Sequence, residues 1–224
     1  MRYNTIMVSR AKNSARRTDR KAAWQYAIDR LERELYPKLC YHSLWHTCDE
    51  VVPAAERLAV LEGVTGQDLD LLITAAYFHD LGYVDVTGVT PEDKRKQERH
   101  EARSIEIALE VLPGFGYNPE QLQAIRGMIL ATKLPQTPHT LLEKILVDAD
   151  LDSLGREDFW DRSFTLRQEM SWYGVKFSDE QWYIGQLDFQ RTHRYFTKAA
   201  RSLRDAGKQY FIKDILERLA EVQV

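Results

Sequence analysis

Four residues of this 224-residue chain form a set that could bind a divalent metal ion: His46, the adjacent pair His79 and Asp80, and Asp150. Two imidazoles and two carboxylates can hold such an ion and still leave coordination positions for water and a substrate. An ion held in this way lowers the pKa of a bound water and stabilises negative charge on an oxygen of the substrate. The set therefore favours metal-assisted hydrolysis.

Each of these residues lies near the end of a segment with helical periodicity. The pair His79 and Asp80 ends an apolar helical run, where an ionisable pair without a partner would be costly to bury. Asp150 ends another apolar run, between Asp148 and Asp152, which share the opposite helical face and stay open as alternative ligands. We therefore expect a metal site between helix ends.

His42 precedes His46 by four residues, a spacing that places both side chains on one face of a helix. One of them could then bind metal while the other contacts the substrate. An ordinary hydrogen-bonded histidine is the alternative for His42.

In this order, and with their flanking residues, the four positions resemble the H…HD…D signature of the HD superfamily of metal-dependent phosphohydrolases. Residues 41–46 resemble the opening YHNxxH, with Ser43 in place of the usual Asn. Residues 78–82 resemble FHDxG, and residues 148–155 resemble DADLxxLG. The resemblance extends over about residues 41–155.

The resemblance implies that His46, His79, Asp80 and Asp150 bind metal, with Asp80 placed to bridge two ions if two are present. It also implies a catalytic role for Asp80 and for His42. In the cyclic-nucleotide phosphodiesterase branch, the histidine matching His42 gives a proton to the leaving oxygen.

Some branches of the superfamily add further histidines that complete a site for two metals. His100 matches the first of these, but residues 119–133 contain no histidine, and Thr132 or Lys133 stands at the expected place. We therefore expect one tightly bound ion, and the ligand set suits Mn²⁺, Fe²⁺, Co²⁺, Ni²⁺ or Mg²⁺. Four residues are candidates for a second site or a substrate contact: His100, Arg103, Lys133 and Lys144.

The elements that must position these residues are predicted to be helices almost throughout. Apolar residues recur with helical spacing, and the pairs Thr90-Pro91, Asn118-Pro119 and Thr137-Pro138 are typical of helix starts. Ser178 and Gln181 match a capping box, and Pro53 is expected to kink or divide the helix over residues 43–62. We predict one all-α domain of eight to ten helices over residues 21–224, preceded by a basic, partly disordered arm over residues 1–20.

The composition excludes several other classes of protein. Hydrophobic residues make up 44% of the chain, which is typical of a globular protein, and the net charge of −3 makes a nucleic-acid partner unlikely. Two cysteines, no apolar run long enough to span a membrane and no secretory signal lead us to expect a cytoplasmic protein. The oligomeric state, monomer or homodimer, stays open.

The expected function is hydrolysis of a phosphate ester or anhydride in a nucleotide or a related small phosphorylated molecule. Whether the enzyme is a phosphomonoesterase or a phosphodiesterase stays open. One alternative is an HD module that senses a nucleotide without turnover. Another is a di-iron HD oxygenase, against which the missing histidine in residues 119–133 argues.

Overall fold

In the computed structural model, which describes residues 18–223, all regular secondary structure is helical, and the all-α prediction is confirmed. The basic arm predicted over residues 1–20 lies outside the described residues except for its last three. The α-helices of the described part are α1 (Arg20–Glu34), α2 (Val52–Leu61), α3 (Gly66–Phe78), α4 (Pro91–Gln97), α5 (His100–Val111), α6 (Pro119–Thr132), α7 (Leu141–Asp150), α8 (Phe159–Trp172), α9 (Asp179–Thr192) and α10 (Lys198–Val222).

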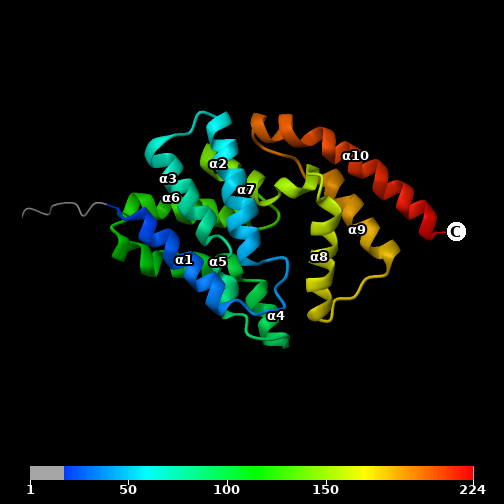
Figure 1. The fold of residues 1–224 in the computed structure, drawn as a ribbon, viewed down its shortest axis with the longest axis horizontal. Helices are drawn as coiled ribbons and strands as arrows, with labels where there is room; N and C mark the ends of the chain where they lie inside the picture. The colour runs from blue at the N-terminus through cyan, green and yellow to red at the C-terminus, as the bar shows by residue number, and fades with distance from the viewer. Residues whose placement is uncertain (1–17, 224) are drawn as a thin grey trace, which may run out of the picture.

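The helices form two neighbouring groups (Figure 1). Helices α1 to α7 pack around one another, with α3 against α1, α2 and α6, and α6 against α5 and α7. Helix α9 packs on the long helix α10, which reaches back to the short 3₁₀ helix η4 (Asp152–Gly155) after α7. One continuous cluster of buried apolar side chains runs through both groups, from Leu58 and Phe78 to Phe159 and Ile215. No α-helix of the described part combines the length and the apolar character that a membrane crossing requires.

Most of the predicted helix starts are correct. Thr90, Asn118 and Ser178 each cap a helix with a capping box, in which the side chain three residues later bonds back to the cap residue. The start predicted at Thr137-Pro138 is wrong, because α7 begins at Leu141. Thr140 caps α7 since Glu143, three residues later, completes the box, a pairing that residues 137 and 138 lack.

The helix predicted over residues 43–62 is divided before Pro53. Its first part is a π-helical turn, η1 (His46–Val51), in which Val52 donates its N–H to the carbonyl of Thr47. Pro53 lies in the first turn of α2, where its missing N–H costs nothing. The wide turn buries His46 and Glu50, which face each other across it. Such turns occur often at functional sites.

Two glycines let η4 and α10 cross at backbone contact. A Cβ atom on Gly207 would overlap the carbonyl oxygen of Gly155, and a Cβ on Gly155 would overlap that of Arg204. Backbone atoms cannot move aside as a flexible side chain can. This crossing holds α10 against the end of α7, where Asp150 lies.

We expect Gly207→Ala to lower the free energy of unfolding by about 2–3 kcal/mol, because the added methyl forces η4 and α10 apart. Chemical denaturation would measure the change. Gly185→Ala in α9 is the matched control, since a Cβ there meets no atom within 4 Å. The control should gain about 1 kcal/mol from helix propensity. Equal stabilisation of both variants would contradict the close crossing.

Candidate functional site

A cavity of about 690 Å³ lies between the two groups of helices. The ends of α4, α5, α6 and α7 line one side, and α8 and α9 line the other. His42, Asp80, His100 and Asp150 line its inner end. His46 and His79 lie directly behind them, 2% and 1% exposed.

The predicted ligands meet at this inner end. His46 Nε2 and His79 Nε2 lie 3.3 and 3.5 Å from Asp150 Oδ1. Asp80 Oδ2 lies 3.3 Å from His79 Nε2 and 3.8 Å from His46 Nε2. One ligand atom from each of His46, His79 and Asp150 falls within 4.8 Å of the others, a separation compatible with a shared metal ion.

The far nitrogen of each imidazole is held by a hydrogen-bond acceptor. His79 Nδ1 lies 2.7 Å from the carbonyl oxygen of Ala76, and His46 Nδ1 lies 3.0 Å from Glu50 Oε2. A proton on Nδ1 satisfies both contacts and leaves the lone pair of Nε2 for a metal. The tautomer that a ligand requires is therefore set by the surrounding helix ends.

Two buried atoms without hydrogen-bond partners also indicate a cation site. His79 Nε2 and Asp80 Oδ2 are buried atoms without a hydrogen-bond partner within residues 18–223. Buried polar atoms normally have partners, so two such atoms 3.3 Å apart and beside Asp150 need an explanation. An ion bound by both atoms provides one.

The electrostatics of the cluster favour positive charge. Burial by itself lowers the pKa of His46, but hydrogen bonds to Asp150 and Glu50 outweigh it and raise this pKa to about 9. Burial also lowers the pKa of His79, but the carboxylates of Asp80 and Asp150 outweigh burial and raise this pKa well above its usual value. Burial also raises the pKa of Asp80 and Asp150, but the histidines hold both pKa values well below the usual range. Two ionised carboxylates that retain protons on neighbouring imidazoles can retain a metal cation instead.

The other two acids of the 148–152 segment have structural partners. Asp148 is fully buried and accepts hydrogen bonds from the backbone of Phe196 and from the backbone and hydroxyl of Thr197, at the start of α10. Asp152 pairs with Arg57 and Arg204. Of the three acids, only Asp150 faces the cavity.

His42 lies at the site, but not on the helix that the sequence predicts for it. It lies in a bend before the helix rather than on a shared helical face with His46, although the two ring centroids are only 6.3 Å apart. Glu169 of α8 holds it there, with Oε1 2.5 Å from His42 Nδ1 and Oε2 accepting the backbone N–H groups of Tyr41 and His42. Burial lowers the pKa of His42, but the Glu169 carboxylate outweighs it and raises this pKa overall.

Tyr83 joins His42 to His100. Its ring packs against both imidazoles, with centroid distances of 4.4 Å to His42 and 4.3 Å to His100, and the two imidazole centroids are 6.0 Å apart. His100 Nδ1 is held by the carbonyl of Gln97, and its Nε2 lies 3.5 Å from Asp80 Oδ1. Gly82 permits this approach, because a Cβ there would overlap the carbonyl oxygen of His100.

A second residue of α8 supports His46 indirectly. Arg162 Nη2 lies 3.0 Å from Glu50 Oε2, and the guanidinium lies over the rings of Tyr41 and Trp45. Arg156 also pairs with Glu50. The carboxylate that sets the tautomer of His46 is thus fixed by two cations.

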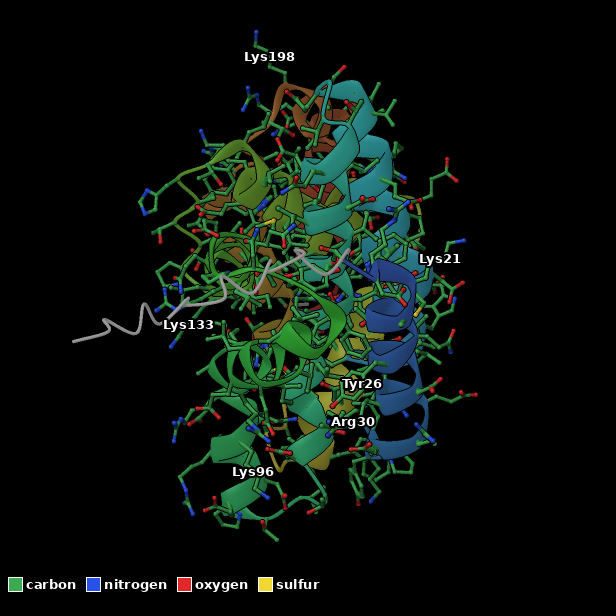
Figure 2. The ribbon with its side chains drawn as sticks, turned by 90° about the vertical axis from the view of Figure 1, so that its left-hand side faces the viewer. Lys21, Tyr26, Arg30, Lys96, Lys133 and Lys198 are labelled. Carbon is green, nitrogen blue, oxygen red and sulfur yellow. The ribbon has the colours of Figure 1, made fainter. Side chains whose placement is uncertain are left out.

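The predicted phosphate contacts separate into two sets. Lys133 lines the cavity and lies at the molecular surface at the end of α6 (Figure 2). Arg103 instead pairs with Asp85 and Glu106 in a different surface hollow. Lys144 is not among the residues that line the cavity, because it lies about one and a half turns before Asp150 on α7. Lys94, which the sequence analysis did not select, does line it.

Sequence reasoning missed the contribution of α8 and of Tyr83. Glu169 and Arg162 lie beyond the family-like segment, and nothing in their local sequence relates them to histidines more than 100 residues earlier. The only available signal was their helical spacing of seven residues, which places both on one face of α8.

Comparison with known proteins finds a family model and a relative that match part of the chain. The HD domain family model matches residues 48–153. An uncharacterised protein of Clostridium beijerinckii is 33% identical over 94 residues, which are 42% of this chain and 54% of the relative. The chain thus aligns with about half the length of that relative.

Two solved structures share the fold. One is described as a predicted HD superfamily hydrolase from an uncultured Thermotogales bacterium, with a TM-score of 0.56 and 20% identity over 90% of this chain and 91% of the other. The second is Bacillus subtilis YpgQ in complex with ADP, with a TM-score of 0.59 and 17% identity over 91% of this chain and 97% of the other. The matched segment of residues 48–153 and the shared helical architecture support an HD-domain protein.

Proposed function

We propose that the protein is a metal-dependent phosphohydrolase whose ion is held by His46, His79, Asp80 and Asp150. The observation that carries the proposal is the convergence of these side chains at the inner end of a large cavity, with His79 Nε2 and Asp80 Oδ2 buried and unpartnered within the described residues. The fold shared with HD superfamily hydrolases supports the class of reaction. The ADP bound by the structural neighbour supports a phosphorylated ligand.

The reaction consumes one water molecule. A divalent ion held by His46, His79, Asp80 and Asp150 would supply a water of lowered pKa and would stabilise negative charge on a phosphoryl oxygen. The attacking oxygen forms a bond to phosphorus, and the bond between phosphorus and the leaving oxygen breaks. His42, which lines the cavity and is held by Glu169, gives a proton to the leaving oxygen. Lys133 and Lys94, which also line the cavity, attract the anionic substrate.

The proposed ligand set predicts different effects for neighbouring acids. Asp150→Ala should weaken Mn²⁺ binding by more than about 100-fold, since even residues that only support a metal ligand contribute about 10- to 100-fold. Asp148→Asn should retain Mn²⁺ affinity but lower the free energy of unfolding by about 2 kcal/mol, because it weakens the hydrogen bonds to α10. Calorimetric titration and chemical denaturation measure the two effects. If only Asp148→Asn lost Mn²⁺ binding, Asp148 rather than Asp150 would be the ligand.

Hydrolysis itself is tested with a panel of nucleotides and simple phosphate esters in Mn²⁺, with release of phosphate or nucleoside as the readout. Asp80→Ala should reduce turnover by more than about 100-fold, because it removes a proposed ligand. Arg103→Ala is the control, since this cation lies outside the cavity and should leave turnover unchanged. No turnover by folded, metal-loaded wild type would reject hydrolysis and favour a nucleotide-sensing module.

The pairing of His42 with Glu169 predicts the alkaline limb of the pH–rate profile. Proton donation needs protonated His42, so the rate falls as pH rises through its pKa. Glu169 raises that pKa and extends activity to higher pH. Glu169→Gln removes the charge and should move the limb to lower pH, as measured by kcat against pH. An unchanged limb with a uniformly lower rate would assign Glu169 a purely structural role.

A further inference from the structure

The cavity is chemically divided. Its inner end carries the predicted metal ligands and His42, whereas its far wall is built by α8, α9 and the segment between them. Apolar side chains dominate that wall, and we call the space they enclose the apolar chamber. Its lining residues include Phe159, Leu166, Met170, Phe177, Trp182 and Phe189.

Gly185 also lines this chamber, in the middle of α9. Glycine is the least favourable residue after proline in a helix interior. Backbone conformation does not require it here, because Gly185 is not among the glycines with positive φ. Close packing does not require it either, since a Cβ atom would meet nothing within 4 Å. A larger side chain at this position would therefore enter open space at the cavity lining.

The charges along the cavity limit the anion that it can accept. Three cationic side chains line it: Lys94, Lys133 and Arg162. Arg162 is committed to Glu50, which leaves two lysines. Five carboxylates line the same cavity: Asp80, Glu98, Glu101, Asp150 and Glu169. One metal ion and two lysines can balance a single phosphoryl group, whereas a polyphosphate chain would face excess negative charge.

We propose that the apolar chamber binds the leaving group of the substrate. This substrate is a phosphate ester with one phosphoryl group and an apolar, ring-containing alcohol. Gly185 determines which leaving groups the chamber accepts. The inference rests on the proposed phosphohydrolase function. Continuity of the chamber with the inner end places an apolar leaving group next to the phosphoryl group that is cleaved. Burial of that group against aromatic rings contributes binding free energy that a small alcohol cannot supply.

The test compares methyl phosphate, 1-naphthylmethyl phosphate and ADP as substrates in Mn²⁺, because 1-naphthylmethanol and methanol are alcohols of similar acidity and therefore similar leaving groups. Wild type should show kcat/KM for the naphthyl ester at least about 100-fold above that for methyl phosphate, since each buried methylene-sized group contributes several-fold. It should also prefer the naphthyl ester to ADP. Gly185→Leu, which narrows the chamber, should reduce the naphthyl-to-methyl ratio at least about tenfold.

Gly114→Leu is the matched control, because it adds the same side chain at a glycine outside the cavity whose Cβ would meet nothing within 4 Å. It should leave the ratio unchanged. Gly185→Ala should raise the melting temperature, which shows that α9 tolerates a side chain at this position. A wild-type ratio near one, an unchanged ratio in Gly185→Leu, or a preference for ADP would overturn the proposal.

A binding measurement separates this proposal from the hydrolytic function. Calorimetric titration of metal-loaded protein with 1-naphthylmethylphosphonate, which cannot be hydrolysed at its P–C bond, measures binding without turnover, and the two leucine variants then separate the contribution of the chamber from that of the metal. Tight binding that weakens in Gly185→Leu but not in Gly114→Leu supports the chamber even if no ester is turned over. Turnover of esters without naphthylphosphonate binding would retain the phosphohydrolase and reject the chamber.

Discussion

The buried carboxylates of Asp80 and Asp150 impose the main constraint on this structure. Both are ionised, and both face the same two imidazoles at distances below 4 Å. Removing two carboxylates from water is costly unless cations compensate their charge. Protons on His46 and His79 provide this compensation when no metal is bound, and a divalent ion can provide it in their place. The arrangement of the surrounding helices follows from the need to hold four such groups at one point.

The helices meet this need mainly through their ends. The π-helical turn presents His46, the end of α3 presents His79 and Asp80, and the last residue of α7 is Asp150. Backbone carbonyls at helix ends lack partners within the helix, and the carbonyl of Ala76 accordingly accepts from His79 Nδ1. The same device recurs where Gln97 holds His100 before α5. The orientation of these two histidines thus uses acceptors that every helix end provides.

Helix α8 links the buried cluster to the cavity. Glu169 orients His42, Arg162 fixes the carboxylate behind His46, and Leu166 between them lines the apolar chamber. One helix, beyond the segment matched to the HD domain, therefore contributes both to the tautomers of the site and to the space beside it. Changes in α8 and α9 could alter substrate choice while the predicted ligands stay constant.

The sequence by itself determined the all-α class, most helix starts and the identity of the residues that converge. These properties depend on local chemistry: periodic apolar residues, capping pairs and a signature that keeps its order along the chain. The start of α7 shows the limit of this reasoning. Both Thr137-Pro138 and Thr140 are residues typical of a helix start, and the helix begins after Thr140 because Glu143 completes its capping box.

Only the tertiary structure decided which acid among Asp148, Asp150 and Asp152 faces the cavity, and it did so by supplying α10, Arg57 and Arg204 as partners for the other two. It also brought Glu169 to His42 across 127 residues and excluded Arg103 and Lys144 from the cavity. Such pairings depend on how distant helices pack, and no local pattern in a single sequence encodes the packing of a particular pair.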